Sequence, residues 1–142
     1  MEVVSDAGGI YAIYDVGDEY HAAVMRVVGA EKRIIVPTPL LGELGYLLGA
    51  RLGPRALSTF LQDLAEGVFA LEPFLPQDVR RCRELVDKYA DLELGLTDAA
   101  VIATAERLNV DRILTVDERD FRPIRNAHGA PFVLLPLDEP TS

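Results

Sequence analysis

Five short apolar runs are spaced along the chain, and glycine, proline, aspartate or asparagine residues bound them. The runs cover residues 3–4, 33–36, 68–71, 112–116 and 131–135. Short apolar runs between such turn residues are typical of β-strands. Because the apolar residues are continuous rather than alternating, we expect strands that are covered on both faces, as in a parallel sheet.

The segments between these runs have the apolar spacing that is typical of helices. We expect helices over residues 19–28, 38–49, 54–66, 77–89 and 97–108, with a shorter one directly after the first strand. In the second of these ranges, Thr38 is a candidate N-cap and Pro39 takes the first helical position. The stripe that the fourth range is expected to bury consists of Val79, Cys82, Val86 and Tyr89.

Strands and helices therefore alternate in the order β-α-α-β-α-α-β-α-α-β-α-β, with a short last helix. This order predicts a three-layer α/β domain, in which helices cover a central parallel sheet of about five short strands. We expect residues 1–136 to form this single domain and residues 137–142 to be a disordered tail. Ligands of such sheets bind beyond the carboxyl ends of the strands, so those loops are where a site is expected.

Composition narrows the class of protein. The chain has 142 residues, 49% of them apolar, and 14 Lys and Arg against 23 Asp and Glu leave a net charge of −9. A single cysteine, Cys82, excludes an intrachain disulfide and favours a cytoplasmic location, and with two histidines it argues against a zinc site. No apolar run reaches the roughly 18 residues of a membrane span. The negative charge argues, at first sight, against a nucleic-acid partner.

Two aspartates stand where the predicted sheet would place a site. Asp6 follows the first strand and Asp117 follows the fourth. Each also precedes a possible helical turn, and aspartate is a favoured N-cap residue, so each has a structural explanation when it is taken singly. Gly8 and Gly9, just after Asp6, are expected to form a flexible turn.

Two further acids lie on the inner sides of predicted helices. Glu43 falls on the flank of an apolar leucine stripe, and Asp98 falls in the middle of an apolar face, in the first turn of its helix. A partly buried glutamate bonded to an arginine or an amide would explain Glu43. An N-cap or a helix-dipole position would explain Asp98, unless Thr97 is the cap and leaves Asp98 free.

Considered together, four acids from four separate elements would converge on one cleft: Asp6, Glu43, Asp98 and Asp117. Like charges packed so closely are unfavourable unless they are protonated or hold a cation. A ligand set made of oxygen atoms alone favours Mg²⁺ or Mn²⁺. A carboxylate-held cation beside open solvent is the arrangement for phosphodiester hydrolysis, and this is the chemistry that the residues predict.

Four segments, in this order and at this spacing, carry a resemblance to a known family. They are residues 4–7 (VSDA), 37–44 (PTPLLGEL), 96–106 (LTDAAVIATAE) and 113–121 (ILTVDERDF), and a closing strand follows at 132–136. The chain resembles the PIN-domain ribonucleases and, within them, the VapC-type toxins of toxin–antitoxin pairs. The resemblance covers nearly the whole chain, to about residue 136.

The resemblance implies a PIN-like fold and a Mg²⁺-dependent endoribonuclease toxin. Its catalytic acids would be Asp6, Glu43, Asp98 and Asp117. One or two metal ions would be held by the three aspartates, while Glu43 would hold the second ion or orient the attacking water. Secondary candidates are Asp120, a nearby extra acid, and Thr115, whose hydroxyl would lie near Asp117. Gly8 departs from the family, which often has Ser, Thr or Asn at that position.

The resemblance also implies three partners. The first is the RNA substrate, for which Arg51 and Arg55 are candidate contacts because they would flank the cleft. The second is an antitoxin protein, which would bind in a groove formed by three tyrosines: Tyr11, Tyr14 and Tyr20. These tyrosines could equally belong to the hydrophobic core. The third is a second copy of the chain, which could meet a small-residue face that internal packing explains about as well: Gly42, Gly45 and Gly49.

Two other interpretations compete with that of a toxic nuclease. The first is a catalytically weak or inert PIN-like protein that acts mainly as a protein-binding module. The second is another acidic-pocket α/β protein, such as a receiver domain or a phosphatase. A receiver needs a lysine after a later strand, and Lys32 and Lys88 are badly placed for it. The phosphatase needs D-x-D after the first strand, where the third position is Gly8.

Overall fold

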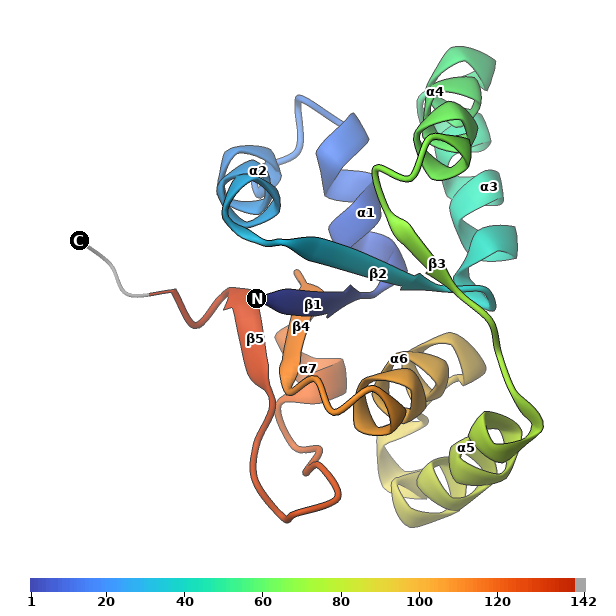
Figure 1. The fold of residues 1–142 in the computed structure, drawn as a ribbon, viewed down its shortest axis with the longest axis vertical. Coiled ribbons are helices and arrows are strands. Elements are labelled where there is room, and N and C mark those ends of the chain that lie inside the picture. The colour runs from blue at the N-terminus through green and yellow to red at the C-terminus, as the bar shows by residue number, and fades with distance from the viewer. Residues whose placement is uncertain (140–142) are drawn as a thin grey trace.

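Five parallel strands form one sheet with helices on both sides in the computed structural model, which describes residues 1–139 (Figure 1). The strands are β1 (Glu2–Ser5), β2 (Arg33–Pro37), β3 (Ala70–Glu72), β4 (Arg112–Thr115) and β5 (Val133–Pro136). The helices are α1 (Ala7–Tyr14), α2 (His21–Ala30), α3 (Leu40–Arg51), α4 (Pro54–Ala65), α5 (Pro76–Lys88), the 3-10 helix η1 (Ala90–Leu92), α6 (Leu96–Arg107) and α7 (Glu118–Phe121). The predicted α/β class and the order of elements are confirmed, with boundaries that differ by at most two residues.

The strand order explains where a ligand site can form. The strands lie in the order β3-β2-β1-β4-β5, so the chain builds outward from β1 to β3 and then crosses to the other side of β1. The helices α1, α2 and α3 contact one face of the sheet, α6 contacts the other, and α5 packs against α6 (Figure 1). This reversal of direction leaves a crevice between the carboxyl ends of β1 and β4, where ligands of such sheets bind.

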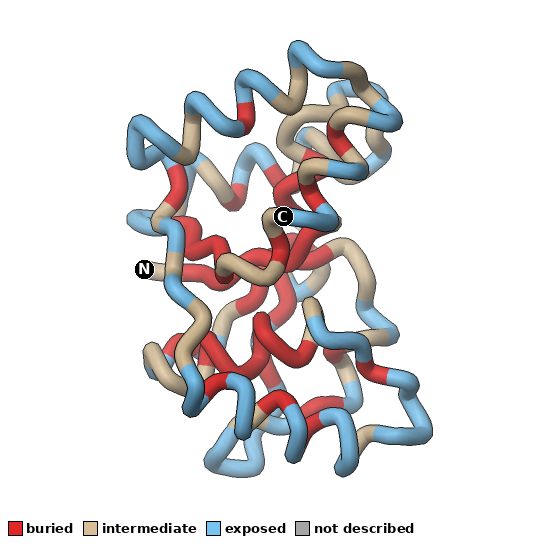
Figure 2. Tube along the Cα trace, turned by 90° about the vertical axis from the view of Figure 1, so that its right-hand side faces the viewer, coloured by how far each residue is buried: buried red, intermediate tan, exposed pale blue. Residues whose placement is uncertain are grey.

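The core lies on both faces of the sheet, as the continuous apolar strands predict. Val3 and Val4 of β1 have no exposed surface, and Figure 2 shows the buried residues gathered in the middle of the molecule. Residues 99–105 of α6 are all buried, because the alanines of this helix let its backbone approach the sheet closely. Among residues 1–139, no helix combines the length and the apolarity needed to cross a bilayer.

The start of α3 differs from the prediction. Thr38 is not the N-cap, because the helix begins at Leu40 and Pro39 occupies the cap position. The hydroxyl of Thr38 instead accepts a hydrogen bond from the amide of Phe74, 3.1 Å away. This contact ties the end of β2 to the segment after β3. The prediction failed because the partner of the hydroxyl lies 36 residues away in the chain.

The buried face of α5 is also rotated from the predicted stripe. Cys82 is buried as expected, but Val79 and Val86 are 52% and 39% exposed, and Asp78 and Leu85 are buried instead. Asp78 can face inward because the guanidinium of Arg107 on α6 bonds its carboxylate at 2.9 Å. Apolar periodicity does not detect a buried acid that a distant arginine neutralises.

The tyrosines near the N-terminus belong to the core. Tyr11 is 8% exposed, and the ring of Tyr14 packs edge-on against Phe60 and Phe69, with ring centres 5.8 and 6.5 Å apart. The hydroxyl of Tyr14 donates to Asp63 of α4 at 2.5 Å. Packing against the core thus accounts for Tyr11 and Tyr14, and the alternative in which these tyrosines form a groove for a partner stays a prediction.

Asp138, shortly after β5, is held by side-chain and backbone hydrogen bonds. Asp138 lies in the segment predicted to be disordered, yet its carboxylate receives two hydrogen bonds from Arg122, of 2.8 and 3.0 Å, and one from the amide of Leu134. These contacts hold Asp138 against Arg122 and β5, while the disordered tail over residues 137–142 stays a prediction. Residues 140–142 of the predicted tail lie outside the described residues.

Candidate active site

A cleft of about 270 Å³ opens at the carboxyl ends of β1 and β4. Its walls are formed by Asp6, Ala7, Gly8, Glu43, Leu47, Thr97, Asp98, Val116, Asp117 and Asp120. Five of these side chains are acidic and none is basic. The structure therefore brings together the four acids predicted from the sequence, and the secondary candidate Asp120 joins them.

Asp6 is both the N-cap of α1 and a wall of the cleft. One carboxylate oxygen accepts a hydrogen bond from the amide of Gly9 at 2.7 Å, and the other accepts one from the hydroxyl of Thr115 at 2.5 Å. Burial raises the pKa of Asp6 to about 6, although both of these hydrogen bonds act to lower it. The capping role and the site role that the sequence offered as alternatives are thus compatible.

Thr115 connects two of the acidic loops. Its buried hydroxyl donates to Asp6 and also accepts a hydrogen bond from the amide of Asp117 at 3.0 Å. The end of β1 and the end of β4 are therefore held in one fixed relation by a single side chain. Asp117 in turn caps α7, where its carboxylate accepts a hydrogen bond from the amide of Arg119 at 3.1 Å.

Gly9 is a residue whose role the sequence analysis missed. It lies inside α1 rather than in a flexible turn, and a Cβ at this position would come within 2.7 Å of the carbonyl oxygen of Leu114 and of the hydroxyl of Ser5. Such distances exclude any side chain unless something shifts. Glycine thus lets α1 start directly against β4, and the two adjacent glycines after Asp6 were the available signal.

Asp98 faces the cleft because it is not needed as a cap. Gly95 occupies the N-cap of α6, and neither Thr97 nor Asp98 caps the helix with its side chain. Burial, followed by the like charges of Asp120 and Asp6, raises the pKa of Asp98 to about 8. The pKa of Asp120 is raised as well, by burial and by the neighbouring carboxyl group of Asp117.

Glu43 lines the cleft from α3 but is more exposed than predicted. The sequence placed it on the flank of the leucine stripe as a partly buried residue, whereas in the structure it is an exposed residue of the first turn of α3. The reason is that Leu40, Leu44 and Leu48 alone fill the buried face. Glu43 therefore reaches the cleft from its solvent side.

Comparison with known proteins identifies the family of this chain. Residues 3–126 match the PIN domain family. The chain belongs to the PIN domain family. It is 30% identical over 135 residues to Ribonuclease VapC26 of Mycobacterium tuberculosis, an alignment that covers 94% of this chain and 100% of that protein.

Two solved structures share the PIN fold. One is VapC20 of Mycobacterium tuberculosis, described as a sarcin–ricin loop cleaving toxin, with a TM-score of 0.72 and 20% identity over 78% of this chain and 86% of that one. The other is a toxin–antitoxin complex from Klebsiella pneumoniae, with a TM-score of 0.65 and 16% identity over 86% of this chain and 92% of that one. At such identities, the likeness shows the fold alone.

The acids of this PIN domain fit a hard divalent cation by their chemistry. All five are oxygen donors, and burial together with the like charges of Asp120 and Asp6 raises the pKa of Asp98, so a cation would favour the charged form of this acid. Across residues 1–139, no three His, Cys, Asp or Glu side chains stand so that they could hold one ion together as they are.

The two arginines predicted to contact RNA lie outside the cleft walls of the PIN domain. Arg51 is in the last turn of α3, with its guanidinium carbon 5.4 Å from the centre of the Tyr11 ring. Arg55 is an exposed residue of the first turn of α4. Arg51 thus lies against α1, the helix that starts in the cleft, while Arg55 has no such contact with α1 among those described.

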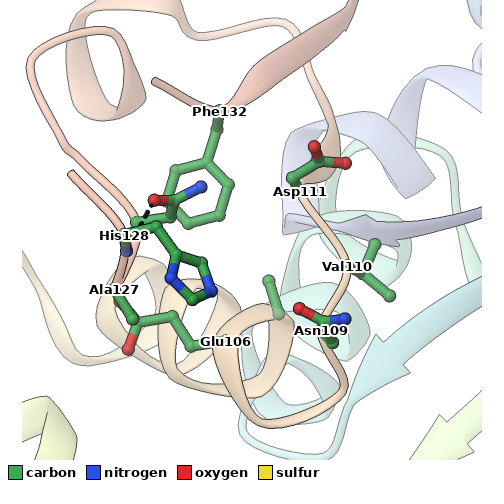
Figure 3. A pocket seen from close by; sticks show the side chains of 9 residues that line it. Glu106, Asn109, Val110, Asp111, Ala127, His128 and Phe132 are labelled. Carbon is green, nitrogen blue, oxygen red and sulfur yellow. Dashed lines mark hydrogen bonds between the residues drawn. The ribbon is translucent and has the colours of Figure 1, made fainter. Parts of the chain in front are cut away.

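A second pocket, of about 220 Å³, lies at the opposite end of the sheet, next to the start of β4 and β5 (Figure 3). His128 points into it from a loop, but Asn126 on the same loop already accepts hydrogen bonds from the amides of His128 and Ala130. Glu106 in its wall is bonded to Arg81 at 2.8 Å. Asp111 is the one acid of this pocket without an ion pair among residues 1–139, whereas five acids line the carboxylate cleft, so that cleft is the candidate active site.

Proposed function

We propose that this PIN domain is a Mg²⁺-dependent endoribonuclease that acts as the toxin of a toxin–antitoxin pair. The observation that carries the proposal is the convergence of five carboxylates on one cleft, where the pKa of Asp98 is about 8. A protein gains no stability from such a set, so a bound cation is the simplest reason for it. The relative named Ribonuclease VapC26 supports the nuclease activity.

The residues have distinct roles in this proposal. Asp6, Asp98 and Asp117 hold one or two cations, and Glu43, on the solvent side, helps to hold a second one or orients the attacking water. Thr115 positions Asp6 and the loop of Asp117. When it is bound in such a site, Mg²⁺ or Mn²⁺ supplies the activation of water and the neutralisation of charge at the phosphate.

Substrate binding in this proposal depends on the cation. The net charge of −9 repels RNA at long range, and the cleft itself has no basic wall. Attraction must therefore come from the bound cation and from nearby arginines. We expect the affinity for RNA to be poor when the metal is removed.

Cleavage of RNA by the purified protein tests the activity. We expect cleavage with Mg²⁺ or Mn²⁺, none after chelation with EDTA, and a loss of more than about 100-fold in Asp117→Asn, since a ligand should matter more than the outer-shell residues whose loss costs 10–100-fold. Asp87→Asn removes the same charge from the exposed face of α5 and serves as the matched control. Equal cleavage by wild type and Asp117→Asn would contradict the assignment.

The proposed partners need separate tests. Expression of the protein alone should arrest bacterial growth, Asp6→Ala should abolish the arrest, and the product of a short upstream reading frame should bind as antitoxin. Growth in both cases would favour the alternative, an inert PIN-like protein-binding module. For the proposed homodimer, a Cβ at Gly42 or Gly45 would meet no atom within 4 Å, so internal packing does not explain these glycines. Light scattering of the purified protein measures this association.

A further inference from the structure

An RNA strand that enters an acidic cleft needs positive charge close by to hold its phosphates. Within residues 1–139, seven arginines lie within 4.0 Å of a carboxylate: Arg26, Arg33, Arg81, Arg107, Arg112, Arg119 and Arg122. Seven basic side chains in the same range form no such pair: Lys32, Arg51, Arg55, Arg80, Arg83, Lys88 and Arg125. The second group contains the candidates for an RNA contact.

Arg51 is the member of this group that continues a wall of the cleft. Glu43, Leu47 and Arg51 follow one another at intervals of four residues on α3, so they share one side of the helix. The first two line the cleft. Arg51 lies beyond the cleft, at the contact between α3 and α1, because its guanidinium lies over the ring of Tyr11 on α1.

The ring of Tyr11 packs against the guanidinium of Arg51. Tyr11 is buried, and its hydroxyl donates to Asp15 at 2.7 Å, so the ring cannot turn away. A guanidinium over an aromatic ring gains about 0.5–1 kcal/mol at an exposed site. Arg51 is exposed and makes no ion pair within residues 1–139, so its planar fork of donors is accessible to a phosphate, which such a fork binds with two hydrogen bonds.

We propose that Arg51, held on the ring of Tyr11, binds a phosphate of the RNA further along the strand than the bond that is cut. This inference rests on the proposed ribonuclease activity. Eight helical steps separate Glu43 from Arg51, which is about 12 Å along the axis. Arg51 therefore contributes to the binding of substrates longer than a dinucleotide and takes no part in the bond-breaking step.

Steady-state kinetics of Arg51→Ala on two substrates test this role. On a fluorogenic single-stranded oligoribonucleotide, KM should rise about tenfold, as expected for the loss of a charged hydrogen-bonded contact, while kcat stays the same. The salt dependence of log(kcat/KM) should become shallower by about 0.7. On a dinucleotide with one phosphodiester bond, Arg51→Ala should behave as wild type. Arg83→Ala removes an unpaired cation from α5 and is the matched control.

Tyrosine variants test the part that the ring plays. Tyr11→Phe keeps the buried ring but loses the hydroxyl, so it should raise KM less than Tyr11→Leu does while Arg51 is still present. An unchanged KM in Arg51→Ala, an equal rise in Arg83→Ala, or an equal loss on the dinucleotide would overturn the inference and leave the ribonuclease proposal intact. If wild type with Mg²⁺ cuts neither substrate, the proposed function fails and the inference fails with it.

Discussion

Helix α6 has a cluster of charged side chains at each of its ends, and the two clusters are built on opposite principles. At the N-terminal end, Asp98 lies in the cleft with Asp6 and Asp120, and all the charges are negative. At the C-terminal end, Arg107 bonds Asp78 and Glu72, each at 2.9 Å, and the charges alternate. The sequence does not show this contrast, because it places acidic residues near apolar positions in both clusters and does not indicate which of them an arginine contacts.

The balanced cluster fastens α5 to α6. Asp78 is 2% exposed, and its carboxylate accepts hydrogen bonds from Arg107 and from the amide of Leu75. A third nitrogen of Arg107 donates to the carbonyl oxygen of Pro73. Every buried charge here has a partner, which is what a structural role requires.

The unbalanced cluster has much weaker compensation within residues 1–139, where Arg119, an exposed side chain, lies 3.9 Å from Asp117. Its acids receive hydrogen bonds from Thr115 and from backbone amides, yet the pKa of Asp98 stays at about 8. Such repulsion destabilises the fold, and its retention is understandable if the acids have a function. The balance of positive and negative charge in a buried cluster, rather than its burial, therefore distinguishes a candidate site from a structural ion pair.

The largest expected effect is on activity in the unbalanced cluster. Asp98→Asn should lower RNA cleavage by more than about 100-fold, because a proposed metal ligand is lost. The same variant should unfold at a temperature a few degrees higher than wild type without metal, because a repelled charge is removed. Cleavage assays and thermal unfolding with EDTA measure both. If Asp98→Asn lost stability as well as activity, Asp98 would have a structural role, and the prediction would be contradicted.

The balanced cluster should respond in the opposite way. Arg107→Met should lower the free energy of unfolding by about 3–5 kcal/mol, because Asp78 is left as a buried and unpaired charge. Urea unfolding followed by circular dichroism measures this change. The double variant Arg107→Met, Asp78→Leu should regain most of the loss, and cleavage per folded molecule should be unaffected in both. A loss of activity in the stable double variant would contradict the division of roles.

An intermediate effect is expected at the hydroxyl that links the acids. Thr115→Val keeps the shape of the side chain but removes the hydrogen bonds to Asp6 and to the amide of Asp117. As the loss of a positioning contact, it should lower kcat by about 10–100-fold. Thr115→Ser keeps the hydroxyl and should restore most of the rate, which would be unexpected if the site only needed a well-packed side chain.

The smallest effect is the pH dependence of stability. The pKa of Asp98 rises from 3.8 to about 8 and that of Asp6 to about 6, so the folded protein keeps protons that the unfolded chain has already lost. The stability from these groups is therefore lost as pH rises through the folded pKa values. Between pH 7 and 8.5, the metal-free wild type should lose about 1–2 kcal/mol, and Asp98→Asn should lose less. Thermal unfolding at constant ionic strength, with and without Mg²⁺, measures the difference.

Much of the fold follows from local patterns in the sequence. The order of elements and the parallel class depend on apolar runs and turn residues that lie within a few positions of each other. The loops of Asp6 and Asp117 follow from the same rule, because parallel strands end at one edge. Where an interaction reaches across the chain, local reasoning failed, as for Thr38 and for the rotated face of α5.

The residues that could carry the candidate chemistry follow from the sequence alone, since the pattern of apolar and polar positions shows which acids stand at strand ends and on inner helix faces. The tertiary structure alone decided which charges are balanced. Arg107 neutralises Asp78 from 29 residues away, whereas Asp98 meets Asp6 and Asp120 across a cleft without a basic wall. The physical reason is that Coulomb energy and desolvation depend on distances in space, which the spacing of residues along the chain does not contain.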